Sequence, residues 1–455
     1  MKYLGIVFLL ATVACTPKKA DIKIAKPHKT TSLRAPAYPL ITIDPYTSAW
    51  SFNDSLFNGP VRHWTGKVHS LIGAVRVDGK VYRFLGKEQM PLKTILPMAG
   101  DVAWEGAYTM KQPGADWEQK GFNAKSWKTG KAAFGSPDMK AVNTEWPSKE
   151  IWVRREFTLS AADLNQDLIL EYSHDDDFEL YVNGKQVVNT GHHARHEVMT
   201  KLDRSLLSAK EKNVIAAHCL NTGGKAYVDF GIYAKGDRPE VFANTAVQDS
   251  IAISATQTIY SFTCGPTNLK LKFLSPLLPD SLDLLSRPVS YVAYELSSLD
   301  GASHDAELYF EISPEWAVDD PGQEVKVTKG QAGNVGYLRT GTTSQKILGK
   351  AGDNVRIDWG YAYLAGVKNE RTSLQINDNL ASRQSFVSNG NAGNGKDSIT
   401  VTMKNTMPAL SYVDRLGKIS QPSNGFVMIG YDDLLSVQYF GDNRPAWWKK
   451  DGKVT

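Results

Sequence analysis

The feature that most constrains this chain is an alternation of apolar and polar residues with a period of two. Between residues 151 and 159, the apolar side chains of Ile151, Val153, Phe157 and Leu159 fall on one face of an extended segment. The ranges 168–172 and 178–182 repeat the pattern. Successive side chains of a β-strand point to opposite faces of the sheet, so this period predicts strands with one buried face. Turn residues about every 8–12 positions then indicate antiparallel β-sandwiches.

Turn signals and further strands extend this prediction along the chain. Asp78-Gly79 and Asn183-Gly184 each interrupt an alternating segment, and Gly tolerates the positive φ of a tight hairpin turn. Helical periodicity is weak, with short helices expected near residues 160–164 and 279–285. Residues 389–395 (NGNAGNG) are predicted to form a flexible loop. Further strands are predicted at 290–297, 306–312, 324–328, 354–365 and 398–403.

The first residues have the pattern of an export signal. A positive start at Lys2 precedes the apolar run 4–13, which is too short for a permanent membrane span and ends just before Ala14-Cys15. This resembles a bacterial lipoprotein signal, in which Cys15 becomes the lipidated residue; an ordinary cleaved signal is the alternative. Thr16 replaces the Asp that would favour inner-membrane retention. We therefore expect an exported protein, lipid-anchored in the outer membrane and periplasmic or on the cell surface.

Composition and charge narrow the class of protein further. The 455 residues suggest about three domains, and 42% hydrophobic residues suffice for real cores. A formal net charge of +4 gives no case for nucleic acid as a partner. Cys219 and Cys264 could pair in an oxidising compartment, but they fall in different predicted domains, which disfavours a disulfide.

The middle of the chain resembles the sugar-binding domain of glycoside hydrolase family 2, a galactose-binding-like jelly roll. The resemblance covers most of 104–233 and is strongest at 174–185 (HDDDFELYVNGK), with support from 143–146 (NTEW), 151–157 (IWVRREF) and 213–218 (NVIAAH). It implies a β-sandwich that serves as a scaffold in those enzymes, and it carries no catalytic residue to this chain.

The flanking regions, roughly 38–100 and 238–448, resemble the N-terminal part of glutaminase A-like proteins. The resemblance rests on an ordered series of motifs: 44–46 (DPY), 48–51 (SAWS), 62–66 (RHWTG), 288–291 (PVSY), 298–301 (SLDG), 358–361 (DWGY) and 439–443 (YFGDN). In that family a β region precedes a large helical domain of the six-hairpin type, where activity is expected to reside. The resemblance therefore implies that this chain lacks that catalytic domain, as a fragment or a stand-alone β module.

These inferences together give a domain plan and a fold class. The class is all-β, with multiple antiparallel sandwiches: a galactose-binding-like jelly roll and a larger β-sandwich domain. The plan assigns 1–15 to the lipoprotein signal, 16–37 to a flexible tether, 38–103 to the first part of the N-terminal β domain, 104–235 to the jelly roll, 236–445 to the large sandwich, and 446–455 to the start of a linker. The Trp447-Trp448 pair either faces a further domain or folds back on the sandwich.

Six residues are candidates for ligand binding or for a domain interface. Aromatic rings stack on sugars or apolar groups, while Asp and His fix hydroxyls or amides; packing is the simpler interpretation. Asp300 with His304 could form a carboxylate-oriented imidazole, although a turn at Asp300-Gly301 explains it equally. No catalytic residue, metal site or cofactor is assigned. The six candidates are Trp50, Asp54, His63, Trp64, Asp300 and His304.

The predicted function follows from the resemblance. We expect the non-catalytic β-sandwich portion of an exported glutaminase A-like hydrolase, whose full-length form would hydrolyse glutamine or act as a glycosidase. The partner would be a glycan or a small amide substrate, with membrane contact only through the N-terminal lipid. One alternative is a carbohydrate-binding surface module; another is a small glycosidase with paired carboxylates.

Overall fold

The structure is a computed structural model that describes residues 34–89, 92–139, 141–234, 239–319, 322–349, 355–403 and 407–452. Cys15 and the predicted signal and most of the tether lie outside these residues. In the described part the elements are mostly strands, arranged as mainly antiparallel sheets, which confirms the all-β class. None of the described helices is long and apolar enough to cross a membrane.

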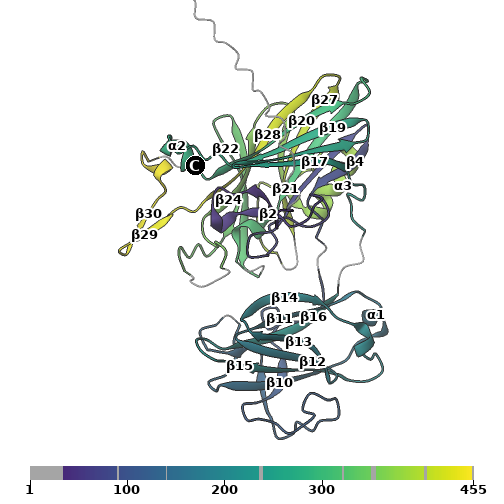
Figure 1. Ribbon diagram of the computed structural model, residues 1–455, viewed down its shortest axis with the longest axis vertical. Helices are drawn as coiled ribbons and strands as arrows, with labels where there is room; N and C mark the ends of the chain where they lie inside the picture. Colours follow the sequence, from purple (N-terminus) through teal and green to yellow (C-terminus); the bar gives the residue numbers. More distant parts are fainter. Residues whose placement is uncertain are drawn as a thin grey trace, which may run out of the picture. The chain divides into compact units, whose positions relative to one another are not determined.

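The larger of two sandwiches contains, within the described residues, a nine-stranded and a five-stranded sheet (Figure 1). The nine-stranded sheet has the order β17 (Val247–Ser254), β18 (Gln257–Cys264), β19 (Thr267–Leu274), β20 (Val289–Ser298), β28 (Ser423–Asp432), β24 (Tyr361–Val367), β23 (Val335–Thr342), β22 (Glu324–Ala332) and β26 (Ser398–Thr402). The five-stranded sheet has the order β25 (Thr372–Asp378), β27 (Pro408–Ile419), β21 (His304–Ile312), β3 (Leu71–Val77) and β4 (Lys80–Leu85).

Period-two patterning explains why these strands form the larger sandwich. In β18, Tyr260, Phe262 and Cys264 are buried while their neighbours are partly exposed, and β20 buries alternate residues in the same way. The buried rings of the two sheets meet between them: Phe84 of β4 lies 5.8 Å from Phe262, measured between ring centroids. Burying alternate apolar residues on both inner faces removes them from water, which is the main favourable term in folding.

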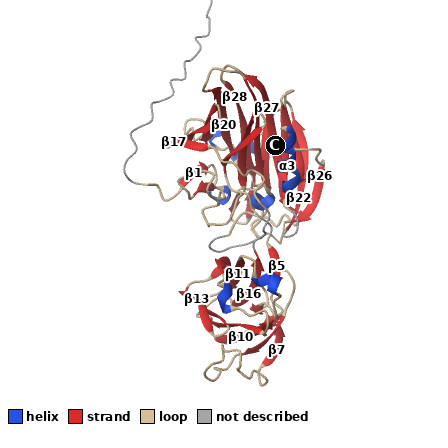
Figure 2. Ribbon diagram, turned by 90° about the vertical axis from the view of Figure 1, so that its right-hand side faces the viewer, coloured by secondary structure: helices blue, strands red, loops and turns tan. Residues whose placement is uncertain are grey.

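The smaller sandwich is made from a contiguous part of the chain and has its own apolar core. Figure 2 shows its strands and its few short helices. Its described strands form one sheet in the order β13 (Lys185–His192), β12 (Asp177–Val182), β15 (Asn213–Leu220), β10 (Glu150–Phe157), β6 (Glu105–Thr109) and β7 (Lys128–Lys131), and a second in the order β14 (Arg195–Lys201), β11 (Leu168–His174), β16 (Tyr227–Ala234), β8 (Phe134–Gly135) and β9 (Thr144–Glu145), with β5 (Lys93–Leu96) paired to β16.

The two tight turns predicted from sequence are present. Asp78 and Gly79 have φ values of 49° and 84° between β3 and β4, and Asn183 and Gly184 have 52° and 87° between β12 and β13. Positive φ at both central residues matches the twist of a two-residue hairpin. Of the expected short helices, α1 (Ala161–Leu164) and α2 (Leu282–Leu285) are found.

One element has no counterpart in the prediction, and one predicted strand is wrong at its start. Helix α3 (Asn379–Asn389) is not predicted from the sequence, and it ends where the predicted 389–395 loop begins. Its buried positions include Ser382 and Arg383, so it has no apolar stripe to reveal a helical period. The strand expected at 354–365 starts only at Tyr361, after the turn at Gly360 (φ 76°).

Neither Cys219 nor Cys264 forms a disulfide. Cys219 lies in β15 of the smaller sandwich and Cys264 in β18 of the larger one, and both are buried. This agrees with the expectation that their positions in separate domains disfavour pairing.

Candidate functional site

The six candidate residues are divided between two places in the larger sandwich. Trp50, Asp54, His63 and Trp64 lie on the segment before β3, whereas His304 starts β21 and Asp300 lies in the turn before it. His69 and Ser70 precede the first residue of β3, while His304 contacts Asp78, which follows the last. A seven-residue strand separates these ends by about 20 Å. The candidates therefore do not converge on one site.

His63 is a fully bonded, neutral histidine. Its Nε2 atom lies 3.0 Å from the Pro45 carbonyl oxygen, which can only accept, so Nε2 carries the proton. Its Nδ1 atom then accepts from the Thr65 hydroxyl at 2.9 Å. Burial lowers the pKa of His63 to about 4. With both ring nitrogens engaged, the side chain fixes the short helix η1 (Pro45–Thr47) against the 63–66 turn.

Trp64 shares the same acceptor and presents its ring to solvent. Its Nε1 atom donates to the Pro45 carbonyl at 2.9 Å, and the side chain is 51% exposed. Tyr46, the next residue after that carbonyl, is 56% exposed. Exposed rings of this size are the features that mark interaction surfaces when they gather in one place.

The other two candidates of this segment have packing roles. Asp54 accepts a hydrogen bond of 3.0 Å from the Tyr38 hydroxyl, which joins this segment to β1 (Tyr38–Ile41). Trp50 lies in β2 (Ala49–Ser51), which pairs with β1, and its backbone exchanges hydrogen bonds with Arg62 at 2.7 and 3.0 Å. Its buried Nε1 atom has no hydrogen-bond partner among the described residues.

A buried cluster that sequence analysis missed lies behind His63. The His69 ring is 4.9 Å from that of His63 and stacks on Trp316 at 5.0 Å. Neither ring nitrogen of His69 has a hydrogen-bond partner in the described part of the chain. Burial, together with the positive charge of Arg356, holds the pKa of His69 well below its usual value, so the ring is neutral. The only local signal for this cluster is the presence of two histidines, His63 and His69, six residues apart.

Glu315 lies in the same region, and other groups of the protein donate hydrogen bonds to its carboxylate. It accepts hydrogen bonds from the Ser70 backbone at 3.2 Å, from the Ser313 hydroxyl at 2.7 Å and from Gln89 at 3.0 Å. Burial raises its pKa above the usual value. Neutral donors on a desolvated carboxyl group hold it in position, and the nearby Arg356 lowers the cost of its charge.

At the other end of β3 and β21, His304 bridges two aspartates. Its Nδ1 atom lies 2.6 Å from Asp78 Oδ2, and its Nε2 atom lies 3.0 Å from Asp300 Oδ1. The hydrogen bonds to Asp300 and Asp78 raise the pKa of His304, and the bond from His304 lowers that of Asp300 to about 2. The backbone of Ala302 also donates to Asp300. The predicted imidazole–carboxylate pair and the predicted turn are thus both present, and the bridge links the β3–β4 hairpin turn to the turn that carries the chain from β20 in one sheet to β21 in the other.

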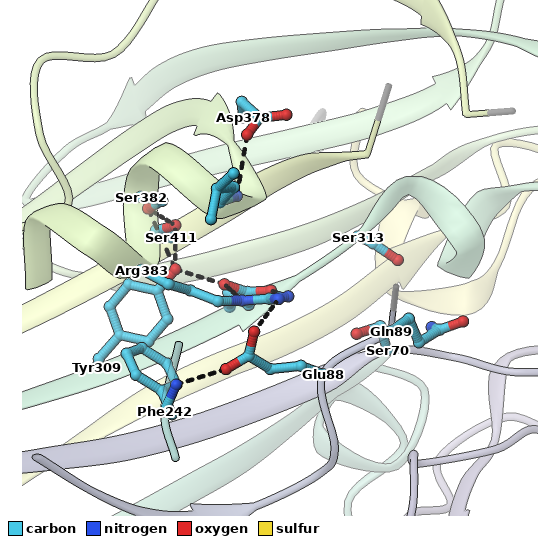
Figure 3. A network of polar contacts seen from close by, with 12 residues as sticks. Ser70, Glu88, Gln89, Phe242, Tyr309, Ser313, Asp378, Ser382, Arg383 and Ser411 are labelled. Atoms are coloured by element: carbon cyan, nitrogen blue, oxygen red, sulfur yellow. Dashed lines mark hydrogen bonds and ion pairs between the residues drawn. The ribbon is translucent and has the colours of Figure 1, made fainter. Parts of the chain in front are cut away.

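Figure 3 shows a third group of charges, around Arg383 of α3, which is buried between that helix and the outer face of the five-stranded sheet. The guanidinium donates to Glu88 at 3.0 Å and to Glu311 of β21 at 3.1 Å. The Phe242 backbone donates to the other Glu88 oxygen at 2.6 Å. Arg383, Glu88 and Glu311 are each 5% exposed or less. The Tyr309 hydroxyl donates to Glu311 and lies 3.0–3.1 Å from the hydroxyls of Ser382 and Ser411.

The His63, His304 and Arg383 groups favour a structural role over a catalytic one. A nucleophile needs an exposed, activated side chain with a base in reach, but burial raises the pKa of the Cys219 and Cys264 thiols. Glu88 and Glu311 share one buried arginine, which holds both carboxylates in ion pairs. The described residues contain no group of three or more His, Cys, Asp or Glu side chains placed to hold a metal ion.

The smaller sandwich carries an aromatic and acidic face on the sheet that contains β10 and β15. Trp152 and His218 are cross-strand partners whose rings stack at 4.6 Å with an interplanar angle of 11°. Glu150 and Glu179 flank the imidazole at 2.9 and 3.5 Å. Nearby on the same sheet, Tyr181 packs against Trp117, which in turn lies 6.5 Å from Trp127.

Two family models match the chain on either side of the smaller sandwich. A domain of unknown function (DUF4964) matches residues 10–97, and another (DUF5127) matches residues 256–455. Glutaminase A of Aspergillus oryzae (strain ATCC 42149 / RIB 40) is 26% identical over 212 residues, which are 45% of this chain and 30% of that protein. Over this 45% of its length the chain is homologous to glutaminase A. The match spans less than a third of the length of this curated relative.

Solved structures of glycoside hydrolases align with parts of this chain at low similarity. A glycosyl hydrolase family 2 member from Bacteroides cellulosilyticus DSM 14838 aligns with 76% of this chain and 35% of its own, at a TM-score of 0.24 and 9% identity. A β-glucuronidase from Ruminococcus gnavus aligns with 64% of this chain and 47% of its own, at 0.25 and 11%. These values carry no information about activity.

Proposed function

We propose that this chain is the β-sandwich portion of an exported glutaminase A-like hydrolase, and that it supports or presents a substrate without breaking bonds itself. The observation that carries the proposal is the 212-residue match to glutaminase A. Amide hydrolysis of glutamine, or a glycosidase-like reaction, then belongs to the whole protein of this type.

The contacts of the candidate residues favour a structural role for this chain. His63 uses both ring nitrogens within the fold, and Glu315 accepts from several protein donors. Arg383 pairs with Glu88 and Glu311 in the interior. The exposed rings of Trp64 and Tyr46 remain as candidates for an interface with another domain or a ligand.

The test is an assay of ammonia release from L-glutamine by the purified chain. We expect release at the background rate of a parallel preparation of the Arg383→Met variant, in which the buried ion pairs between α3 and the five-stranded sheet are broken. Turnover by the unmodified chain that the variant lacks would overturn the proposal, because both preparations carry the same contaminants.

We also propose that the chain is exported and lipid-anchored through Cys15 in the outer membrane. Its support is the apolar run 4–13 followed by Ala14-Cys15. Expression in a bacterial host with an alkyne-bearing fatty acid should label the protein in the outer-membrane fraction. Cys15→Ser should abolish the label, and persistence of the label in that variant would reject Cys15 as the modified residue.

A carbohydrate-binding module is the second candidate function. It is favoured by the face of the smaller sandwich on which Trp152 and His218 stack between Glu150 and Glu179, with Trp127 near by. Stacked aromatic rings beside carboxylates are suited to the apolar faces and hydroxyls of sugars.

A glycan array tests this second candidate. Binding that is lost in Trp127→Ala and kept in Trp447→Ala would support it, since Trp447 is 49% exposed but lies outside the smaller sandwich. An array with no bound glycan, or equal loss in both variants, would remove it.

A further inference from the structure

The inner face of the nine-stranded sheet changes from apolar to charged at one end. In β22, Val325 and Val327 are buried, but Lys329, the next residue of the same face, is exposed, and Gln331 follows it. In β24 the buried Leu364 is followed on the same face by Gly366 and then, just beyond the strand, by Lys368. Inner positions of a sandwich are normally filled by apolar side chains, so a charged end of this face is a departure from the pattern that builds the core.

At this end of the sheet, glycines occupy inner positions where larger side chains would fill the space between the two sheets. Gly336 of β23 is the cross-strand partner of Gly366 and, on the other side, of Gln331. A Cβ on Gly366 would lie 2.4 Å from Cε2 of Tyr412, and one on Gly336 would lie 3.0 Å from Cδ1 of Leu374. Both glycines therefore face the opposing sheet, where Leu374 of β25 and Tyr412 of β27 are themselves partners. A glycine in a strand interior commonly marks a close approach of this kind.

The result is a crevice between the two sheets with a volume of about 230 Å³. Both sheets contribute to its walls, which include Lys329, Lys368, Leu374, Gln375 and Tyr412. Pockets for drug-sized ligands are about 300–1,000 Å³, so this one suits a molecule the size of a single sugar ring. Leu374 and the Tyr412 ring provide an apolar floor for a carbon face.

The charges of the crevice select the chemistry of its ligand. Its lining contains two lysines and neither Asp nor Glu. Lys368 donates to the neutral amide oxygen of Gln331 at 3.0 Å, and neither ammonium forms an ion pair with any residue in the described part of the chain. The Gln375 side-chain oxygen already accepts from the Gly395 backbone, at 3.2 Å. The lining side chains that are left to contact a ligand therefore offer mainly hydrogen-bond donors, as a binding site for an anion requires.

We propose that this crevice binds a small carboxylate-bearing molecule of the size of an acidic monosaccharide. The carboxylate lies between the ammonium groups of Lys329 and Lys368, and the Gln375 amide donates to a ring oxygen. A zwitterionic amino acid fits less well, because its ammonium group finds no carboxylate in the lining. The proposal is independent of the function proposed above and of the aromatic face of the smaller sandwich.

Calorimetric titration of the purified chain with D-galacturonate tests the proposal, with D-galactose, L-glutamate and inorganic phosphate as comparison ligands. We expect saturable binding of galacturonate that weakens at high salt, no detectable binding of galactose, and weaker binding of glutamate and phosphate. The double variant Lys329→Gln/Lys368→Gln should lose at least about tenfold in affinity, since two charge-assisted contacts are removed.

The matched control is Lys326→Gln, which removes an exposed lysine from the outer face of the same strand, β22. It should bind galacturonate like the unmodified chain, and Trp127→Ala should do so as well. Equal binding of galactose, equally tight binding of phosphate, or the absence of galacturonate binding by a folded protein would each overturn the proposal. So would a double variant that binds as well as the control.

Discussion

The larger sandwich uses the same charge arrangement twice, in two environments. Arg383 lies between Glu88 and Glu311, and His304 lies between Asp300 and Asp78. The first group is interior, with each of its side chains at most 2% exposed, whereas the aspartate side chains of the second are 50–52% exposed. One cation between two carboxylates therefore forms a buried ion-pair network in the first group and a solvent-exposed one in the second.

Burial decides what each arrangement does. An unpaired charge in a buried position is costly, so the Arg383 group, under α3, joins its elements firmly and responds little to salt. It connects α3, β21 and the segments at Glu88 and Phe242. At the surface water screens the pairs, so the His304 bridge contributes less and depends on pH and on salt.

The largest expected effect comes from breaking the internal group. Arg383→Met leaves two carboxylates buried without their cation, and we expect a loss of about 3–5 kcal/mol in the free energy of unfolding. Urea unfolding followed by tryptophan fluorescence measures it. Arg415→Met, on an exposed position of β27, should change the stability by less than about 0.5 kcal/mol. Equal stability of the two variants would contradict the role given to Arg383.

Removing one hydroxyl from the same group should cost less. Tyr309→Phe deletes the donor to Glu311 and the contacts with Ser382 and Ser411. An unsatisfied buried acceptor costs about 1–3 kcal/mol, and the same urea titration would detect it. If Tyr309→Phe in the Arg383→Met background costs as much as it does alone, the two side chains do not act as one network.

The contribution of the His304 bridge to the stability of the fold should depend on pH. The pKa of His304 is raised in the folded protein, so its contribution is present below the pKa of an unfolded histidine, about 6.5, and is lost as the pH rises through the folded value. The pKa of Asp300 is about 2, below its unfolded value, so the aspartate contribution is lost only in strong acid. The bridge is therefore strongest between about pH 4 and 6.5.

Comparing the unfolding midpoints of the unmodified chain and His304→Gln from pH 5 to 9 isolates this effect. The difference between the two proteins should shrink as the pH rises, and should also shrink in high salt at pH 5.5. A difference that stays constant with pH would mean that His304 acts through packing and not through its charge.

The smallest expected effect concerns the exposed ring near the other end of β3. Trp64→Ala should leave the unfolding midpoint nearly unchanged, because the side chain is 51% exposed and makes one hydrogen bond, to the Pro45 carbonyl. His63→Ala, which empties a buried position and leaves that carbonyl without a second donor, should destabilise the fold by more. Equal losses in thermal unfolding would assign Trp64 to the core.

The sequence could identify some of the candidate residues but not their arrangement. Asp300 and His304 are four residues apart, and their pairing was anticipated. Asp78 completes the bridge from 226 residues away, and Glu88 reaches Arg383 across 295. Neither partner has a local signal, because the strand register that brings β3 beside β21 is set by the packing of the whole sandwich.

By itself the sequence determined that this chain forms sheets. Period-two burial and Gly at positive φ are local requirements, so β18, β20 and the Asp78-Gly79 turn are readable without a structure. The tertiary structure decided that the polar face of α3 is buried, since Arg383 and Ser382 are held there by partners on β21 and β27. Local pattern fixes which face of a strand is apolar, but only the packed chain fixes which distant charge lies against it.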